Sequence, residues 1–378
     1  MDLPLDYATL KVIWWGLVGV LLIGFALTDG YDLGVQTLLP FIAKSDEERR
    51  TVIRTVAPTW EGHQVWLITA GGALFAAWPF VYAVSFSGFY LAMFIVLSAL
   101  ILRPVGFKYR SKRPDPAWRS GWDWALFTGG MVPALIFGVA MGNVLQGAPF
   151  TIDQELRTTY GGNLLGLLNP FALLCGLTST ALLVTHGVAY LNGKLEEGPV
   201  RNRALAVGKI SALFALALFA IAGVWLQSFG FRLDAPMDPD GLANPLRKSV
   251  TAAPGAWFDN YSLHPWMMIA PASGFLGLFL AWFGLSRRSD LALLGSSLSV
   301  VGMIASVGAS MFPFILPSSA DPRASLMVWD SSSSHLTLFI MLIAVAIFLP
   351  IVLVYTAWVL NVLKGRIGSD AVNNDSPY

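Results

Sequence analysis

Ionisable side chains next to three apolar segments are the most informative feature of this chain of 378 residues. Asp29 and Asp32 follow the first long apolar run, Glu61 and His63 begin the second, and Arg103 ends the third. Ionisable groups at or near bilayer depth are costly, so they are usually paired or functional. This set fits two kinds of chemistry: a static network of buried ion pairs, or a relay that passes protons inward through carboxylates and water.

The spacing of the acidic residues gives each of them a local interpretation. Asp29 and Asp32 are three residues apart, so they share one face if the helix continues through them. Glu61 begins a predicted helix, where the helix dipole favours a carboxylate. Glu61 is therefore a helix cap, an ion-pair partner of Arg103, or a third carboxylate of a proton relay. Arg103, together with Trp60, is predicted to support the carboxylates.

The composition determines which elements must position these groups. The chain is 55% hydrophobic and only 12% charged, and its mean hydropathy is +0.63. A soluble domain has about 25% charged residues, so the sequence predicts an all-α polytopic membrane protein that forms one integral membrane domain over residues 1–378. A spanning helix needs about 20 mostly apolar residues, which predicts about nine transmembrane helices in a bundle. The predicted spans lie near residues 12–28, 62–78, 80–102, 123–142, 163–191, 205–228, 265–286, 290–313 and 335–360.

The positions of Lys and Arg predict the orientation of the bundle. Most of the 24 Lys and Arg residues lie after the first, third, fifth and seventh predicted spans, or after the last. By the positive-inside rule these segments are cytoplasmic, so the N-terminus is expected to be periplasmic and the C-terminus cytoplasmic. Residues 229–264 are then a long periplasmic loop. The net charge of +1 gives no reason to expect nucleic-acid binding, and the single Cys175 excludes a disulfide framework.

The four histidines were considered as haem or metal ligands. His63 and His186 are predicted on the inner side, and His264 and His335 on the outer side, so no pair suggests a bis-imidazole site. Ligation by one histidine together with a methionine stays open. No zinc spacing, phosphate-binding loop or nucleophile elbow is present in the sequence.

Several segments, in order along almost the whole chain, carry a family resemblance. The chain resembles subunit II of the bacterial cytochrome bd quinol oxidases, including their cyanide-insensitive branch. The segments include Thr28-Asp29-Gly30-Tyr31-Asp32, Trp60-Glu61-Gly62-His63-Gln64-Val65-Trp66, Arg103-Pro104-Val105-Gly106-Phe107, Gly142-Asn143-Val144-Leu145-Gln146-Gly147 and Met311-Phe312-Pro313-Phe314.

The resemblance implies a multi-pass protein of the bacterial inner membrane that is not catalytic alone. It implies a larger partner, subunit I, which carries the b-type and d-type haems and the quinol site. The complex would oxidise quinol and reduce oxygen to water with protons from the cytoplasm, building a gradient without pumping. Some members of the family also hold a bound quinone of structural role. A small single-span accessory subunit, and a quinone or a phospholipid in the bundle of this chain, stay open at this point.

The resemblance also assigns roles to residues. Asp29, Asp32 and Glu61 match the family's proton-route positions, with Arg103 close by. This chain has Glu61 where many relatives have Asp, and His63 where they have Asn. A glutamate keeps a proton-labile carboxylate, and His63 either joins the relay or hydrogen-bonds Glu61.

Two alternatives to the oxidase subunit remain at this stage. The first is a proton-coupled secondary transporter that uses Asp29, Asp32 and Glu61 for coupling. Against it, these residues end a span instead of lying at the midplane, and the two halves of the chain show no matching interrupted helices. The second is a purely structural membrane scaffold, which differs from the oxidase subunit only in whether Glu61 matters for turnover.

Overall fold

The structure is a computed structural model that describes residues 3–363 and 365–367. Within these residues the chain forms thirteen α-helices, six short strands and five short 3-10 helices. The α-helices are α1 (Tyr7–Ile42), α2 (Asp46–Val56), α3 (Trp60–Ala77), α4 (Pro79–Gly88), α5 (Tyr90–Tyr109), α6 (Pro116–Gln146), α7 (Leu164–Leu167), α8 (Pro170–Lys194), α9 (Pro199–Trp225), α10 (Asp259–Leu263), α11 (Ile269–Gly284), α12 (Ser289–Met311) and α13 (His335–Val362). The 3-10 helices are η1 (Arg110–Lys112), η2 (Leu226–Ser228), η3 (Ala256–Phe258), η4 (Pro265–Met268) and η5 (Pro322–Ala324).

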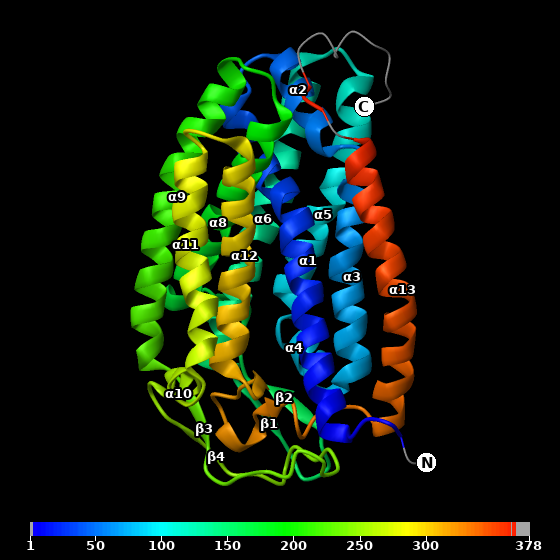
Figure 1. The fold of residues 1–378 in the computed structure, drawn as a ribbon, viewed down its shortest axis with the longest axis vertical. Coiled ribbons are helices and arrows are strands. Elements are labelled where there is room, and N and C mark those ends of the chain that lie inside the picture. The colour runs from blue at the N-terminus through cyan, green and yellow to red at the C-terminus, as the bar shows by residue number, and fades with distance from the viewer. Residues whose placement is uncertain (1–2, 364, 368–378) are drawn as a thin grey trace.

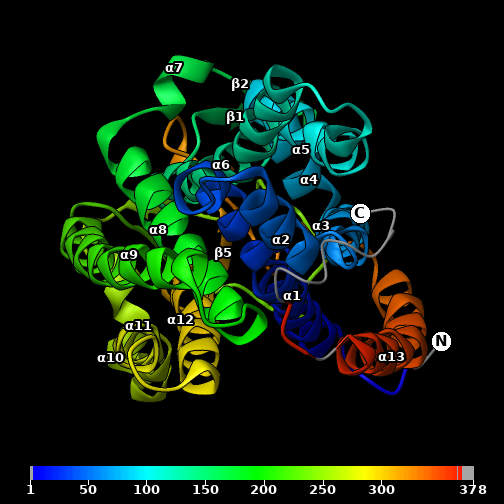
Figure 2. The same ribbon diagram turned by 90° about the horizontal axis from the view of Figure 1, so that it is seen from above.

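The long helices run side by side along one axis and form an elongated bundle (Figure 1). α8, α9, α11 and α12 form one side of the bundle, whereas α3 and α13 lie on the other (Figure 2). α1 lies between the two sides and packs against α3, α6, α8 and α12. Residues 29–39 of α1 are buried on every face, so each polar side chain there needs a partner inside the protein.

Eight helical segments of the described chain are long and apolar enough to cross a membrane. This confirms the predicted class, an all-α polytopic membrane protein. The prediction of about nine spans depends on α3, which covers the predicted span near 62–78 but is not among the eight. The first turns of α3 carry Glu61, His63 and Gln64, which lower its hydropathy. α3 ends at Trp78, where Pro79 begins α4 in a new direction.

The first helix is much longer than the predicted span near 12–28. α1 continues to Ile42, so Asp29 and Asp32 lie inside the helix instead of at its end. Leu33, Val35 and Leu38 extend the apolar packing surface past the carboxylates, and no proline interrupts the helix before Pro40. The two aspartates therefore share one face of a continuous helix.

One glycine position shows how closely α1 and α8 approach each other. A Cβ atom on Gly34 would lie 2.0 Å from the carbonyl oxygen of Leu183, and one on Gly187 would lie 2.7 Å from the backbone nitrogen of Val35. Backbone atoms cannot move aside as a flexible side chain can. Glycine is therefore required at Gly34 for this helix contact.

Strand pairs cover the end of the bundle at which α1 and α13 begin (Figure 1). The strands form three antiparallel pairs, β1 (Phe150–Ile152) with β2 (Thr158–Tyr160), β3 (Phe231–Leu233) with β4 (Val250–Ala252), and β5 (Phe314–Leu316) with β6 (Leu326–Met327). We call these pairs, together with residues 229–264, the outer cap. Residues 229–264, predicted only as a long loop, contain β3, β4, η3 and α10.

Two buried lysines hold the outer cap in place. Lys11 of α1 donates to the carbonyl oxygens of Pro239, Gly241 and Trp329 over 2.9 to 3.2 Å. Lys248 forms a buried ion pair with Asp330, which also accepts the N–H of Met327. Burial lowers the pKa of Lys248 and raises the pKa of Asp330.

Candidate functional site: a buried cluster of two aspartates, an arginine and a histidine

Arg103 of α5 and Asp29 of α1 form the most buried ion pair of the site. Nη1 of Arg103 donates to Oδ2 of Asp29 over 2.9 Å, and Nη2 donates to Oδ1 over 2.6 Å. Neither side chain has any exposed surface. A two-point guanidinium–carboxylate pair fixes both partners in orientation as well as in charge, so Asp29 is held as the counter-ion of Arg103.

Asp32 lies one turn further along α1 and has a different partner. Its Oδ2 lies 2.7 Å from Nδ1 of His63 on α3 and 3.9 Å from Nη2 of Arg103. Nε2 of His63 lies 3.2 Å from the hydroxyl of Tyr31. The imidazole therefore connects a buried carboxylate to a tyrosine hydroxyl, and each connection is a hydrogen bond along which a proton can move.

We call four side chains the buried cluster: Asp29, Asp32, His63 and Arg103. All four are at most 4% exposed. Two carboxylates and one guanidinium leave one uncompensated negative charge if His63 is neutral. Unbalanced charge is costly in a buried site, and one further proton on Asp32 or His63 would balance it.

Aromatic rings surround the buried cluster. Trp60 packs over the guanidinium of Arg103, with 5.5 Å from Cζ to the ring centre. Tyr31 stacks on Tyr190 of α8 at 4.0 Å between ring centres. The hydroxyl of Tyr190 donates to the carbonyl of Thr55 over 2.7 Å. These rings limit the access of bulk water to the charges.

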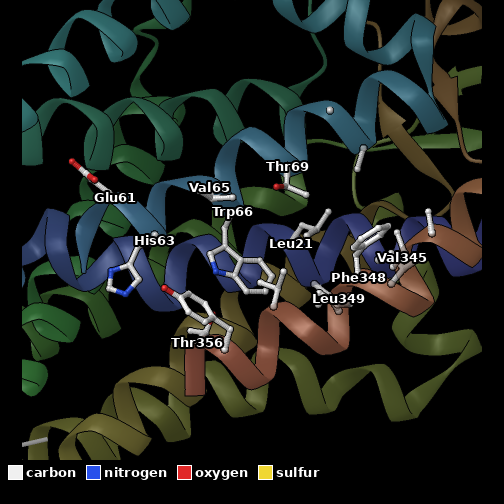
Figure 3. A pocket seen from close by; sticks show the side chains of 18 of the residues that line it. Leu21, Glu61, His63, Val65, Trp66, Thr69, Val345, Phe348, Leu349 and Thr356 are labelled. Atoms are coloured by element: carbon white, nitrogen blue, oxygen red, sulfur yellow. The ribbon is translucent and has the colours of Figure 1, made fainter. Parts of the chain in front are cut away.

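Glu61 does not join the buried cluster, and its predicted ion pair with Arg103 is wrong. Its side chain is 66% exposed, and Oε1 lies 3.6 Å from Nζ of Lys108. The reason is helical geometry, because residues two positions apart point to opposite sides of a helix. His63 points toward α1, so Glu61 points to the outer surface of α3. Figure 3 shows the two side chains directed away from one another.

A long groove begins beside His63. It has a volume of about 810 Å³ and lies between α1, α3 and α13. Glu61 and His63 lie at one end, Trp66 lies in the middle, and Phe348 lies toward the other end (Figure 3). Apart from the end at Glu61 and His63, the groove is almost entirely apolar. Its shape and lining suit a ligand that has one long apolar chain and a polar head group.

The histidines were tested as haem ligands. His63 uses both ring nitrogens in the contacts above. His186 also uses both, with Nδ1 at 2.9 Å from Oγ of Ser296 and Nε2 at 3.0 Å from the carbonyl of Leu27. Nε2 of His335 is 2.7 Å from the carbonyl of Leu5, and His264 is exposed. None of these four histidines is therefore a buried imidazole free to bind iron, and the described residues contain no group of three or more His, Cys, Asp or Glu that could hold a metal ion.

A second ionic network holds the ends of helices near α2. Asp123 of α6 is buried and accepts hydrogen bonds from Arg110 and from Arg49, the latter over 2.7 Å. Asp46 of α2 pairs with Arg110 at 2.9 Å and with Arg119 at 2.7 Å. Every carboxylate here faces two arginines. This network therefore stabilises the packing of α2 on α5 and α6, and none of these residues is a histidine.

Sequence reasoning missed three polar side chains at the site. Tyr31 lies between the two aspartates in the sequence, Lys108 follows Arg103 by five residues on α5, and Gln36 is 2% exposed one turn beyond Asp32. The spacing of Asp29, Asp32 and Gln36 would have placed all three on one helix face, had the first helix been predicted to continue. No signal in the sequence identifies Lys108 as the partner of Glu61.

Comparison with known proteins gives consistent matches over nearly the whole chain. The family described as cytochrome bd terminal oxidase subunit II matches residues 10–363. A probable cytochrome oxidase subunit 2 of Haemophilus influenzae is 50% identical over 373 residues, which is 98% of each chain. The cytochrome bd-I ubiquinol oxidase subunit 2 of Escherichia coli is 46% identical over 375 residues, 98% of this chain and 99% of that protein.

A solved structure is similar in fold. The bd oxidase of Geobacillus thermodenitrificans contains a chain that superposes with a TM-score of 0.68 at 14% identity. The match covers 94% of this chain and 98% of that chain. At this identity the likeness concerns the arrangement of the helices, not the side chains of the site.

Proposed function

The chain belongs to the cytochrome bd terminal oxidase subunit II family, and from this premise we propose that its buried cluster carries protons toward the haem-bearing partner. The protein is a subunit of a cytochrome bd-type quinol oxidase, a respiratory oxidoreductase complex, and is a multi-pass protein of the bacterial inner membrane. The comparisons give no support to a transporter. Subunit I is the implied partner, and the family implies haems in the complex.

The observation that carries the proposal is the contact of 2.7 Å between Asp32 and His63, beside a fixed Asp29–Arg103 pair. The fixed pair is a poor relay, because its carboxylate is neutralised by a group that does not lose its proton. We therefore divide the predicted residues by role. Asp32 and His63 exchange the proton, whereas Asp29, Arg103 and Trp60 hold the charge environment in which that proton is stable.

Glu61 is proposed as the step between this chain and subunit I. A pair of charged side chains on the outside of a membrane helix is costly against lipid, so the exposed Glu61–Lys108 pair favours coverage by protein. Around it α3 and α5 expose large apolar residues, among them Val65, Ile68 and Ile101. We propose that subunit I docks on this face of α3 and α5, with the end of the bundle near α2 toward the cytoplasm.

The proposal extends to lipid ligands and small partners. The groove between α1, α3 and α13 fits an isoprenoid quinone or a phospholipid, with its polar head at the end near His63. α13 exposes most of its surface, which leaves its outer face for membrane lipid or a small single-span accessory subunit. The haems, b and d in type, are proposed to lie in subunit I, where quinol is oxidised and oxygen is reduced.

A tagged purification of the complex in mild detergent from its own host tests the assignment. We expect a larger subunit, b- and d-type haem bands in the reduced-minus-oxidised spectrum, and quinol oxidase activity. Lipid extraction and mass spectrometry of the same sample will show which molecule fills the groove. A colourless single chain would contradict the proposed partner, and a full-rate Asp32→Asn complex would contradict the proton route.

A further inference from the structure

Four buried polar atoms next to Asp32 have no hydrogen-bond partner among the described residues. They are Oδ1 of Asp32, Nε of Arg103, and both Oε1 and Nε2 of Gln36. Gln36 is 2% exposed, and Asp32 and Arg103 have no exposed surface. Buried polar groups in native proteins are nearly always satisfied by protein or by ordered water, so these four atoms together indicate internal water.

The four atoms lie around one contact between α1, α5 and α6. Gln36 follows Asp32 by one helical turn on α1, so both side chains leave the helix on the same face. Nη2 of Arg103 is 3.9 Å from Oδ2 of Asp32. Two consecutive glycines of α6 touch both neighbours. A Cβ on Gly129 would be 2.9 Å from Cγ of Arg103, and one on Gly130 would be 2.8 Å from Cβ of Gln36.

The chemistry of these atoms suits water. Nε of Arg103 and Nε2 of Gln36 donate, whereas Oδ1 of Asp32 and Oε1 of Gln36 accept. An internal water usually makes about three hydrogen bonds to groups of both kinds. The contacts within the buried cluster use other atoms. Oδ2 of Asp32 faces His63, and the two Nη atoms of Arg103 face Asp29, so Oδ1 of Asp32 and Nε of Arg103 remain for water.

We propose that Gln36 is a positioning residue of the proton route, and that it orders internal water which delivers protons to Oδ1 of Asp32. This inference rests on the proposed function of the buried cluster. A water molecule gives its proton to Oδ1 as the O–H bond breaks, and takes a replacement from the next water on the side of Gln36. In the same exchange Oδ2 of Asp32, which carries a proton at the start, releases it to Nδ1 of neutral His63, so that Asp32 stays neutral with the new proton on Oδ1 and His63 becomes an imidazolium. Gln36 itself neither gains nor loses a proton.

The alternative is that Gln36 only fills the space left by the two glycines. Gln36→Leu and Gln36→Glu in the purified complex separate these roles. Gln36→Leu keeps the volume and removes the hydrogen bonds, whereas Gln36→Glu keeps polar atoms for water. Gln146→Leu is the matched control. Gln146 also has a buried unpartnered Oε1, but it is the last residue of α6, away from Gly129 and Gly130 in the middle of that helix.

We expect Gln36→Leu to lower quinol oxidase turnover about tenfold and to increase its solvent deuterium isotope effect. This loss is smaller than the roughly 10²- to 10⁴-fold cost of removing a proton-transferring group itself. Gln36→Glu should keep most of the turnover, and Gln146→Leu should keep both turnover and isotope effect. An unchanged rate and isotope effect in Gln36→Leu would overturn the inference.

Two further results complete the test. If Asp32→Asn slows turnover while Gln36→Leu does not, the role of Gln36 fails and the proposed proton route stands. If Asp32→Asn also has no effect, the route itself fails. Should Gln36→Leu not assemble, a structure of the wild-type complex that resolves internal water decides the question: water bonded to Gln36 and Oδ1 of Asp32 supports the inference, and direct protein contacts at both overturn it.

Discussion

Asp29 and Asp32 lie one turn apart on α1, yet they are bound by partners of different chemistry. Asp29 receives two hydrogen bonds from Arg103, whereas Oδ2 of Asp32 lies 2.7 Å from an imidazole nitrogen of His63. A guanidinium stays charged at any physiological pH, but an imidazole exchanges its proton near neutrality. The same helix face thus carries one carboxylate bound to a permanent charge and one bound to an imidazole, and different predictions follow for each.

Removal of the fixed charge should affect stability. We expect Asp29→Asn to destabilise the complex by about 3–5 kcal/mol, because it leaves the guanidinium of Arg103 buried and uncompensated. A double replacement, Asp29→Leu with Arg103→Leu, should recover part of this loss. Thermal unfolding of the purified complexes measures both effects. A double variant less stable than the single one would contradict the assignment of Arg103 as a charge whose main partner is Asp29.

Removal of the proton-labile group should affect turnover. Asp32→Asn or His63→Leu should slow quinol oxidase turnover about 10²-fold with normal haem content, since each takes away a group that exchanges a proton. His186→Asn is the matched control. It changes another buried histidine whose nitrogens bind Ser296 and Leu27, so it should lower stability but not the rate per assembled complex. A rate loss in His186→Asn equal to that in His63→Leu would argue against a specific relay.

Glu61 is predicted to matter for rate but not for folding. In the chain by itself the exposed pair of Glu61 with Lys108 contributes at most about 1 kcal/mol. Glu61→Gln should therefore give an assembled complex of normal thermal stability and reduced turnover. Lys108→Met is a useful comparison, because it removes the pair but keeps the carboxylate. Poor assembly of Glu61→Gln with full specific activity in the remainder would mean that Glu61 has only a structural role.

The contact between α1 and α8 makes a prediction that does not depend on catalysis. Gly34→Ala should severely reduce assembly, because the new methyl group would lie 2.0 Å from the carbonyl oxygen of Leu183. Gly19→Ala, on the same helix, meets no atom within 4 Å and should be neutral or slightly stabilising. Expression yield and thermal stability of the two variants check this. Equal stability of both would show that the two helices can separate.

The ion pair of the outer cap should stabilise least at a pH between the shifted pKa values of Asp330 and Lys248. Burial raises the pKa of Asp330 above its ordinary 3.8, so the contribution of this carboxyl to stability falls as pH rises from about 3.8 through the raised value. Burial lowers the pKa of Lys248 below its ordinary 10.5, so its contribution rises with pH between the lowered value and 10.5. Between the raised pKa of Asp330 and the lowered pKa of Lys248 both groups are charged and both penalties apply.

Replacement of this ion pair is the corresponding experiment. Lys248→Met with Asp330→Asn keeps an acceptor for the N–H of Met327 and removes both charges. We expect the double variant to match the wild type at pH 7 or exceed its stability by about 1–4 kcal/mol, and Asp330→Asn alone to be less stable. Thermal unfolding between pH 5 and 9 measures the difference. A double variant much less stable than Asp330→Asn alone would contradict this account.

The sequence by itself determined the class of the protein and its family, and it proposed the residues that bear the chemistry. Hydropathy is summed along the chain, so the apolar runs predicted a membrane bundle without knowledge of any contact. The spacing of Asp29 and Asp32 is also local, and it predicted a shared helix face on the one condition that the helix continues through both residues. Even so, the end of the first helix was misplaced, because packing against α6 and α8 keeps residues 29–42 helical.

Only the tertiary structure decided which charged groups meet. The sequence left Glu61 as a candidate partner of Arg103, but Asp29 takes that place and Glu61 turns outward to Lys108. Which carboxylate pairs with Arg103 depends on the rotation of α3 about its axis and on its axial position relative to α5. Local sequence spacing determines neither. For the same reason the link from Asp32 through His63 to Tyr31, and the unpartnered Gln36 beside it, could be found only once the helices were packed together.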